Sequence, residues 1–400
     1  MALNKPTGVP DRIILTWSKD PTTTQSVTWR TDTSVSEGWA EISPLSEGPR
    51  FVDRTGWVRA VTEKVVTDLS EAHYHSATFT DLQPDTQYVY RVGDGRTWSP
   101  WHQFRTAAAT AGEPLEFLLF GDIQHGIESH WTRLVRTAVA HAPNARLAVY
   151  LGDIVEDWNR DGQWGEFLRA GAPLHQSVSA FPTPGNHEYG ETLTPNWRPQ
   201  FTLPLNGIPG HEEAVYYLDI QGVRFISLNS THMSPEQAQW LDEVLKSNLN
   251  KWTVIVLHYP IFPSVPDRDE PYQRGLILPI IEMHGVDLVL AGHDHVYARS
   301  GIVCNSNSPN PRAGAVYVNT VSGAKMYDIK AQPWMLRKAE DTQLFSVVRV
   351  SGDELTFETR TPSGALYDRF ILRKVPGKQN LLINDIPPTA ERLRVLGTSN

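Results

Sequence analysis

Seven polar residues share one context, because each follows a short apolar run directly or lies in a glycine-containing loop between such runs. They are Asp122, Asp153, Asn186, His187, His258, His293 and His295. Oxygen and nitrogen ligands without thiolate suit borderline or hard divalent ions such as Mn, Fe(II), Zn or Co. The pattern therefore predicts a metal site.

A pair of metal ions at such a site would favour hydrolysis by in-line displacement. Two ions about 3.5–4 Å apart, joined by a carboxylate, clamp the attacking and the leaving oxygens. Binding to a metal lowers the pKa of water from 15.7 to about 7, so the hydroxide nucleophile needs no protein base. A histidine with a pKa near neutrality could then protonate the leaving group.

Each motif alone has a plainer interpretation. A single Gly-Asp pair is commonly a helix N-cap, and Asn186-His187 fits an ordinary turn. His293 and His295 in isolation could belong to a polar loop. Five motifs in order, four of them at the ends of predicted strands, outweigh these alternatives.

Residues 1–108 predict a β-sandwich. Short runs with strand-like patterns are separated by turn formers, which is typical of sandwiches. The runs are 12–18, 25–31, 39–45, 75–82, 87–94 and 101–107. The stretch LQPDTQY, residues 82–88, resembles the tyrosine corner of a fibronectin type III domain, in which Tyr88 would bond back to the preceding loop.

Strands and helices alternate beyond the flexible stretch AAATAGEP. Core strands are predicted over 115–120, 147–151, 223–229, 252–257 and 286–291. Helical spacing predicts a helix over 129–142 and another from Pro235, with Ser234 as N-cap and Gln237 as its capping-box partner. The closing stretch 345–375 alternates like a meander of strands. Ligands of an α/β sheet bind beyond the carboxyl ends of its strands, where the polar set lies.

We therefore expect two domains and a tail. A β-sandwich over residues 1–108 precedes an α/β domain over 112–375, in which mixed sheets are flanked by helices, and 376–400 form a C-terminal tail. A length of 400 residues agrees with two domains.

Composition narrows the classes of function. A net charge of −9 without a Lys/Arg run argues against binding to nucleic acid or to an anionic membrane. No apolar run is long enough for a membrane span. The N-terminal MALNKPTGVPDRI lacks the apolar core of a signal peptide, so we expect a cytosolic protein or one whose export segment has been removed.

The ordered series GD, GD, GNHE, a strand-terminal His and GHDH resembles the five-motif signature of calcineurin-like metallophosphoesterases. With the fibronectin-like domain in front, and with the stretches GVRFISLNS, SPEQAQWL and HGVDLVLAGHDHVYAR, residues 10–375 are most similar to the purple acid phosphatase branch. The resemblance implies a dinuclear metallophosphoesterase fold, a small-molecule phosphate-ester substrate, and secretion or a periplasmic location.

Position by position, the resemblance implies that Asp153 bridges two divalent metal ions and that His187 is the general acid. The other implied ligands are Asp122 and His295 for the first metal, and Asn186, His258 and His293 for the second.

Two positions depart from the purple acid phosphatase pattern. That branch has a Tyr three residues after the bridging Asp, and its phenolate binds Fe(III) and gives the colour; this chain has Glu156. Gln124 resembles the Asp-x-Gln form of manganese-dependent ADP-ribose/CDP-alcohol diphosphatases, which places it on the first metal. We expect a colourless enzyme that prefers divalent Mn, Fe, Zn or Co. Further candidates for contact with substrate or ligands are Glu156, His125, Glu188, Arg268 and Arg274.

The leading expectation is hydrolysis of phosphate monoesters, as in an acid phosphatase. One alternative is a phosphodiesterase or nucleotide diphosphatase that uses the same metals. Another is a catalytically inactive phosphate-binding module. The intact set of ligands, together with His187, argues against the inactive module.

Overall fold

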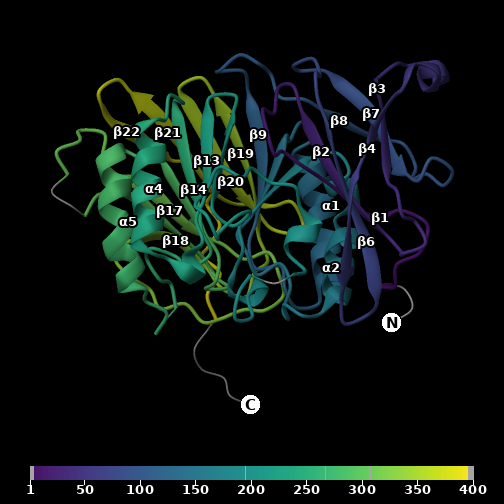
Figure 1. Ribbon diagram of the computed structural model, residues 1–400. Coiled ribbons are helices and arrows are strands. Elements are labelled where there is room, and N and C mark those ends of the chain that lie inside the picture. The colour runs from purple at the N-terminus through teal and green to yellow at the C-terminus, as the bar shows by residue number, and fades with distance from the viewer. Residues whose placement is uncertain (1–3, 194, 266, 306–307, 395–400) are drawn as a thin grey trace.

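The computed structural model describes residues 4–193, 195–265, 267–305 and 308–394. Two large β-sheets lie side by side at the centre, and helices flank them on both outer sides (Figure 1). An all-β unit formed by the N-terminal residues adjoins this body. The architecture confirms the predicted class, which is mixed sheets flanked by helices and preceded by a β-sandwich.

The larger sheet has 11 strands, and three parallel strands form its centre. These are β9 (Leu115–Phe120), β10 (Leu147–Tyr150) and β11 (Ser179–Pro182). Antiparallel strands extend it on the β9 side, in the order β19 (Phe345–Ser351), β20 (Glu354–Arg360), β21 (Leu366–Val375) and β22 (Lys378–Asn384). The predicted meander is thus present. Strand β22 lies within the segment expected to be a tail, and it pairs with β21.

The N-terminal strands continue the same sheet on its other side. Strand β1 (Asp11–Thr16) pairs in parallel with β11 at Thr16↔Ala180. It is followed by β2 (Gln25–Thr31), β6 (Glu71–Phe79) and β5 (Val61–Val66). The two predicted domains therefore share one sheet.

A four-stranded sheet completes the N-terminal sandwich. Its order is β4 (Gly56–Arg59), β3 (Trp39–Pro44), β7 (Gln87–Gly93) and β8 (His102–Arg105). The backbone nitrogen of Gln83 donates to the phenol oxygen of Tyr88 over 2.8 Å, which is the bond expected of a tyrosine corner.

The second large sheet has seven strands. Their order is β12 (Tyr216–Ile220), β13 (Val223–Ser227), β14 (Trp252–Val256), β15 (Leu288–Ala291), β17 (Ala315–Asn319), β16 (Tyr297–Val303) and β18 (Met335–Ala339). Strands β13, β14, β15 and β17 are parallel, so their carboxyl ends meet at one edge. The two large sheets pack through apolar side chains such as Phe117 and Phe225, whose rings meet edge-on at 5.0 Å.

Five α-helices cover the sheets within the described part of the chain. Helices α1 (Thr132–His141), α2 (Asp161–Ala170) and α3 (Ala172–His175) lie on the larger sheet, and α4 (Pro235–Lys246) and α5 (Pro271–His284) lie on the second. Short 3-10 or π turns cover Pro49–Arg54, Ile127–Trp131, Asn186–Glu188, Arg198–Gln200 and Ser230–His232. None of the described helices is long and apolar enough to cross a membrane.

Helix α4 begins as predicted, with one difference. The hydroxyl of Ser234 accepts from the backbone nitrogen of Gln237 over 3.2 Å. The side chain of Gln237 does not close a capping box. It bonds instead to both backbone groups of Asn229, at 2.7 and 3.1 Å, and so fastens the helix to the loop after β13.

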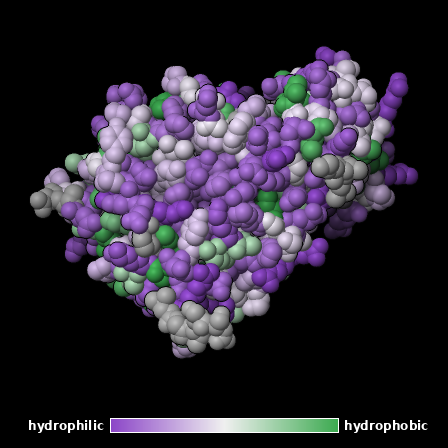
Figure 2. All heavy atoms as spheres, turned by 90° about the horizontal axis from the view of Figure 1, so that it is seen from below, coloured by the Kyte–Doolittle hydropathy of each residue, from purple (hydrophilic) through white to green (hydrophobic). Residues whose placement is uncertain are grey.

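The surface is polar on the face seen from below. Figure 2 shows mostly hydrophilic residues there, with hydrophobic ones in small separate groups. That face therefore offers no broad apolar area outside the atoms drawn in grey.

Candidate metal centre

The structure brings the predicted ligands together beyond the carboxyl ends of β9, β10, β14 and β15. They form two groups, in each of which the ligand atoms lie within 4.8 Å of one another: Asp122, Asp153 and His295, and Asp153, His258 and His293. Asp153 belongs to both groups. This shared position is the one that a bridging carboxylate requires.

Asp153 lies beside the predicted ligands of the second metal. One carboxylate oxygen of Asp153 is 3.2 Å from Nε2 of His258. The same Nε2 is 3.1 Å from the amide oxygen of Asn186 and 3.3 Å from Nδ1 of His293. A carbonyl oxygen, that of Leu151, accepts from Nδ1 of His258 at 2.8 Å. That bond turns Nε2 toward the site, as in many metal-binding histidines.

The predicted ligands of the first metal lie on the other side of Asp153. Nε2 of His295 is 3.4 Å from a carboxylate oxygen of Asp122. The amide nitrogen of Gln124 is 2.9 Å from Nε2 of His295 and 3.1 Å from Oδ2 of Asp153. Its amide oxygen is buried without a hydrogen-bond partner. A half-turn of the carboxamide would place that oxygen between Asp153 and His295, where it could coordinate a metal ion.

The electrostatics of the cluster also fit a bound cation. Burial, reinforced by Asp153, raises the pKa of Asp122 well above its usual value, although His258 opposes this. Burial lowers the pKa of His293 to about 2 and that of His295 to about 3, so both rings are neutral, as metal ligands must be. Among the described residues, no Lys or Arg pairs with Asp122 or Asp153. His258 differs from the other two histidines, because Asp153 and Asp122 raise its pKa to about 9 in spite of its burial. A divalent ion would take the place of the proton on this ring.

Backbone geometry aims several ligands at the cluster. Four of them adopt left-handed φ angles, which are uncommon for residues other than glycine: Asp122 (47°), Asp153 (49°), His293 (69°) and His295 (49°). Two glycines give the carboxylates room. A Cβ on Gly185 would lie 2.2 Å from Oδ1 of Asp153, and one on Gly292 would lie 2.5 Å from Oδ2 of Asp122.

Glu188 ties two of the motif loops together. Its fully buried carboxylate accepts from the backbone nitrogens of Asp153 (2.9 Å), Ile154 (2.8 Å), Val155 (3.1 Å) and Gly185 (2.7 Å). Four hydrogen bonds to one carboxylate fix the backbone that carries Asp153. Glu188 therefore positions the ligands and does not point toward them.

His187 and Glu156 lie at the partly exposed side of the cluster. Nδ1 of His187 donates to the carbonyl oxygen of Glu156 over 2.5 Å, and Nε2 is 3.9 Å from Asp153. The carboxylate of Glu156 pairs with Nε2 of His125 at 3.0 Å and with Nζ of Lys325 at 3.4 Å. It contacts none of the predicted ligands in these interactions.

The two arginine candidates differ. Nη1 of Arg268 donates to the carbonyl oxygen of His293 over 2.6 Å, and its guanidinium lies 4.5 Å from the ring centre of Tyr327. Arg274 instead pairs with Asp269 and with the carbonyl oxygen of Ile261. Its contacts are thus with the segment that leads into α5 and not with the ligand cluster.

Sequence reasoning missed the loop between β17 and β18. The carbonyl oxygen of Lys325 accepts from Nδ1 of His295 over 2.8 Å, and the ring of Tyr327 lies 4.8 Å from that of His295. No spacing or motif marks the stretch SGAKMYD, so only the fold places it at the site.

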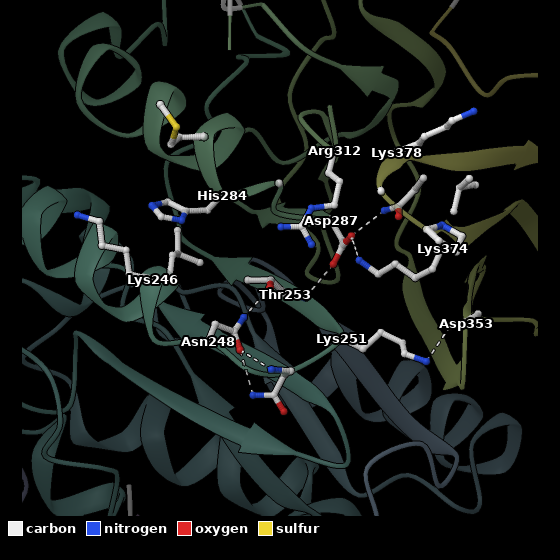
Figure 3. Close-up of a pocket in the computed structure, with 18 residues that line it drawn as sticks. Lys246, Asn248, Lys251, Thr253, His284, Asp287, Arg312, Asp353, Lys374 and Lys378 are labelled. Atoms are coloured by element: carbon white, nitrogen blue, oxygen red, sulfur yellow. Dashed lines mark hydrogen bonds and ion pairs between the residues drawn. The ribbon is translucent and has the colours of Figure 1, made fainter. Parts of the chain in front are cut away.

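A cavity of about 610 Å³ lies at the opposite edge of the second sheet. It is lined by residues at the ends of α4 and α5 and at the starts of β14 and β15, and it contains none of the predicted ligands (Figure 3). Two of its lysines form ion pairs within the protein. Lys374 pairs with Asp287, and Lys251 pairs with Asp353 at 2.7 Å. Cations beside helix C-termini also offset the helix dipole, so the cavity has a structural explanation.

The fold and the Asp/His/Asn cluster together define a metallophosphoesterase. Residues 10–106 match the family model described as Purple acid Phosphatase, N-terminal domain, and residues 115–297 match that of Calcineurin-like phosphoesterase. Acid phosphatase type 7 of Mus musculus is 26% identical over 343 residues, covering 78% of this chain and 76% of its own length. Probable purple acid phosphatase 20 of Arabidopsis thaliana is 25% identical over 335 residues, covering 79% and 72%.

Solved structures share the fold. Purple acid phosphatase PPD1 from yellow lupin (Lupinus luteus) superposes with a TM-score of 0.77 at 18% identity, covering 91% of this chain and 74% of that one. PhoD superposes with a TM-score of 0.68 at 14% identity, covering 96% and 94%. Residues 115–297 belong to the calcineurin-like phosphoesterases, and residues 10–106 in front of them to the N-terminal domains of purple acid phosphatases. The chain is a phosphatase-type hydrolase that uses metal ions to hydrolyse small phosphate esters.

Proposed function

We propose that the chain hydrolyses phosphate monoesters at a dinuclear site, with His187 as general acid. The observation that carries the proposal is the position of Asp153 in both ligand groups. Asp122, Gln124 and His295 would complete the first metal site. Asn186, His258 and His293 would complete the second.

The bound ions would supply an acidified water as nucleophile and positive charge for the transferring phosphoryl group. The chain's own residues would then position the reacting groups. Asp153 is held by the backbone nitrogen of His187 at 3.0 Å, so the bridging ligand and the general acid keep a fixed spacing. His187 would deliver its proton from Nε2, because Nδ1 is bound to the carbonyl oxygen of Glu156.

We infer that both ions are divalent. The ligand set contains oxygen and nitrogen only, which suits Mn, Fe(II), Zn or Co. Glu156 stands where purple acid phosphatases have their phenolate ligand, and its carboxylate is bound to His125 and Lys325. The purified enzyme should therefore show no visible charge-transfer band. An intense visible band would contradict this assignment.

The test of substrate class is a comparison of rates on three substrates with metal analysis on the same sample. We expect about two metal ions per chain, and faster turnover of a nitrophenyl phosphate monoester than of its diester or of a nucleotide diphosphate. Diester turnover above monoester turnover would refute the monoesterase proposal and would leave the fold unaffected.

The test of the bridging role is Asp153→Ala. Both ligand groups lose a member in this variant, so metal content and turnover should fall together. Asp157→Ala is a matched control, because Asp157 lies four residues further on and bonds to Gln163 at 3.1 Å. Full turnover by Asp153→Ala would refute the dinuclear mechanism.

A further inference from the structure

Lys325 is anchored at both its backbone and its side chain beside the predicted first-metal site. Its carbonyl oxygen accepts from His295, and its ammonium lies 3.4 Å from Glu156 and 6.0 Å from the ring centre of Tyr327. Its side chain is 24% exposed. The ammonium is therefore held near the site while part of it faces solvent.

Glu156 connects Lys325 to the proposed proton donor. The backbone oxygen of Glu156 holds His187, and its side-chain Oε1 holds Lys325 and His125. A general acid protonates the leaving oxygen, so the groups around His187 face the departing part of the substrate. Lys325 thus lies on the leaving-group side of the site.

The ion pair leaves binding capacity on both partners. An ammonium has three N–H donors, and the only ion pair of Lys325 within the described residues is with Glu156. Oε2 of Glu156 is buried without a hydrogen-bond partner. The pair is therefore not a saturated structural salt bridge, and a donor of Lys325 remains available to a bound ligand.

A second cation is held differently across Tyr327. The guanidinium of Arg268 stacks on the ring of Tyr327 and bonds to the carbonyl oxygen of His293, on the second-metal side. Its position suits the transferring phosphoryl group. Lys325 is then the cation whose N–H donors are available to bind the leaving group.

We propose that Lys325 binds an anionic group on the leaving portion of the substrate, so that the preferred monoesters carry a carboxylate or a second phosphate beyond the scissile bond. The inference rests on the proposed monoesterase function. Glu156 holds the ammonium in place and competes with the substrate anion for it.

The experiment compares two substrates that differ in one group. 3-Phosphoglycerate releases an alcohol that carries a carboxylate, whereas glycerol 3-phosphate releases a neutral one. The wild type should favour 3-phosphoglycerate in kcat/KM by about tenfold or more, as expected for a charge-assisted hydrogen bond. Lys325→Met should remove that preference by raising KM for 3-phosphoglycerate more than KM for glycerol 3-phosphate. Lys325→Arg should restore most of it.

Two further variants distinguish binding of the substrate anion by Lys325 from a structural role of Lys325 in its loop. Glu156→Gln removes the competing charge and should increase the preference for 3-phosphoglycerate. Lys330→Met makes the same charge change at an exposed position of the same loop and should leave the preference unaltered. An equal loss on both substrates in Lys325→Met, or an unchanged preference, would overturn the proposal.

Failure of the proposed function gives a separate result. If the metal-loaded wild type hydrolyses neither monoester, the monoesterase proposal is wrong. Ligand binding then decides the role of Lys325: 3-phosphoglycerate should raise Tm more than glycerol 3-phosphate does, and Lys325→Met should abolish the difference. Equal Tm shifts in the wild type would overturn it.

Discussion

His187 donates from Nδ1 to the backbone carbonyl oxygen of Glu156 over 2.5 Å. A carbonyl oxygen can only accept, so Nδ1 keeps its proton and Nε2 is the nitrogen that faces Asp153. In the proposed mechanism the transferable proton is therefore the one on Nε2.

Replacing His187 should slow the reaction without removing the metals. We expect His187→Ala to lower kcat by about 10²–10⁴-fold, with a larger loss for alkyl than for nitrophenyl leaving groups. Steady-state rates and metal content of the same preparation provide the measurement. The exposed imidazole of His130 offers a control, and His130→Ala should behave as the wild type. A loss equal for all leaving groups would argue against the general-acid role.

Glu188 should be required for stability as well as for metal binding. Glu188→Gln keeps the shape of the side chain, but its amide nitrogen would face backbone N–H donors in place of a carboxylate oxygen. We expect the free energy of unfolding to fall by about 2–3 kcal/mol and metal content to decrease. Chemical denaturation, with and without added metal, checks this. Glu191→Gln, an exposed change in the same loop, should have no effect, and unchanged stability of Glu188→Gln would contradict the role.

A buried ion cluster joins the N-terminal sandwich to α2. Asp161 accepts from Arg12 at 2.5 and 2.9 Å and from Arg30 at 3.2 Å, and its side chain is 1% exposed. Asp161→Ala would leave two buried arginines without this partner, which should cost about 3–5 kcal/mol of unfolding free energy. The exposed pair Glu37–Arg59 is the matched control, because Glu37→Ala should cost only about 0–1 kcal/mol. Similar losses in the two variants would show that the cluster contributes little.

His175 should make stability depend on pH. Burial among aromatic rings lowers the pKa of His175 to about 3, whereas the unfolded chain binds this proton near pH 6.5. Between these values the unfolded state holds the extra proton, so stability falls as pH falls below about 6.5. His175→Gln keeps an acceptor for Tyr150, which lies 2.9 Å from Nε2, and removes the titration.

Urea unfolding at pH 7 and pH 5 measures this effect. The wild type should lose up to about 1.4 kcal/mol more per pH unit than His175→Gln over that interval. Equal pH dependence in the two proteins would show that His175 does not contribute.

The grouping of the predicted metal ligands could be expected from the sequence, because the ends of the strands before them lie together in space. Asp122 and Asp153 follow the parallel strands β9 and β10 of the larger sheet. His258 and His293 follow the parallel strands β14 and β15 of the second sheet. Residues far apart along the chain therefore lie close together where these carboxyl ends meet. The same reasoning could not predict that Lys325 lies at the site. Its loop follows an apolar strand without a spacing rule, and only the crossover between β16, β17 and β18 brings it to His295.

Several fold elements escaped prediction for physical reasons. Strand β4 is mostly exposed and β5 largely so, so neither shows the apolar alternation that marks a half-buried strand. Strand β22 looks like a tail because its residues are exposed or half-buried at a sheet edge. Gln237 has the right spacing for a capping box, but the loop at Asn229 offers its side chain two backbone partners.

Because β1 pairs in parallel with β11, the N-terminal sandwich protects the edge that the strands β9, β10 and β11 would otherwise leave unpaired. A chain shortened to begin at residue 112 would expose the β11 edge, whose unpaired backbone groups are a template for pairing with other chains. It would also strip Asp161 of both arginines at the start of the helix that follows the Asp153 loop. A metal site drawn entirely from residues 122–295 would thus depend on strands that contribute no ligand, and we expect the two halves to unfold as one cooperative unit.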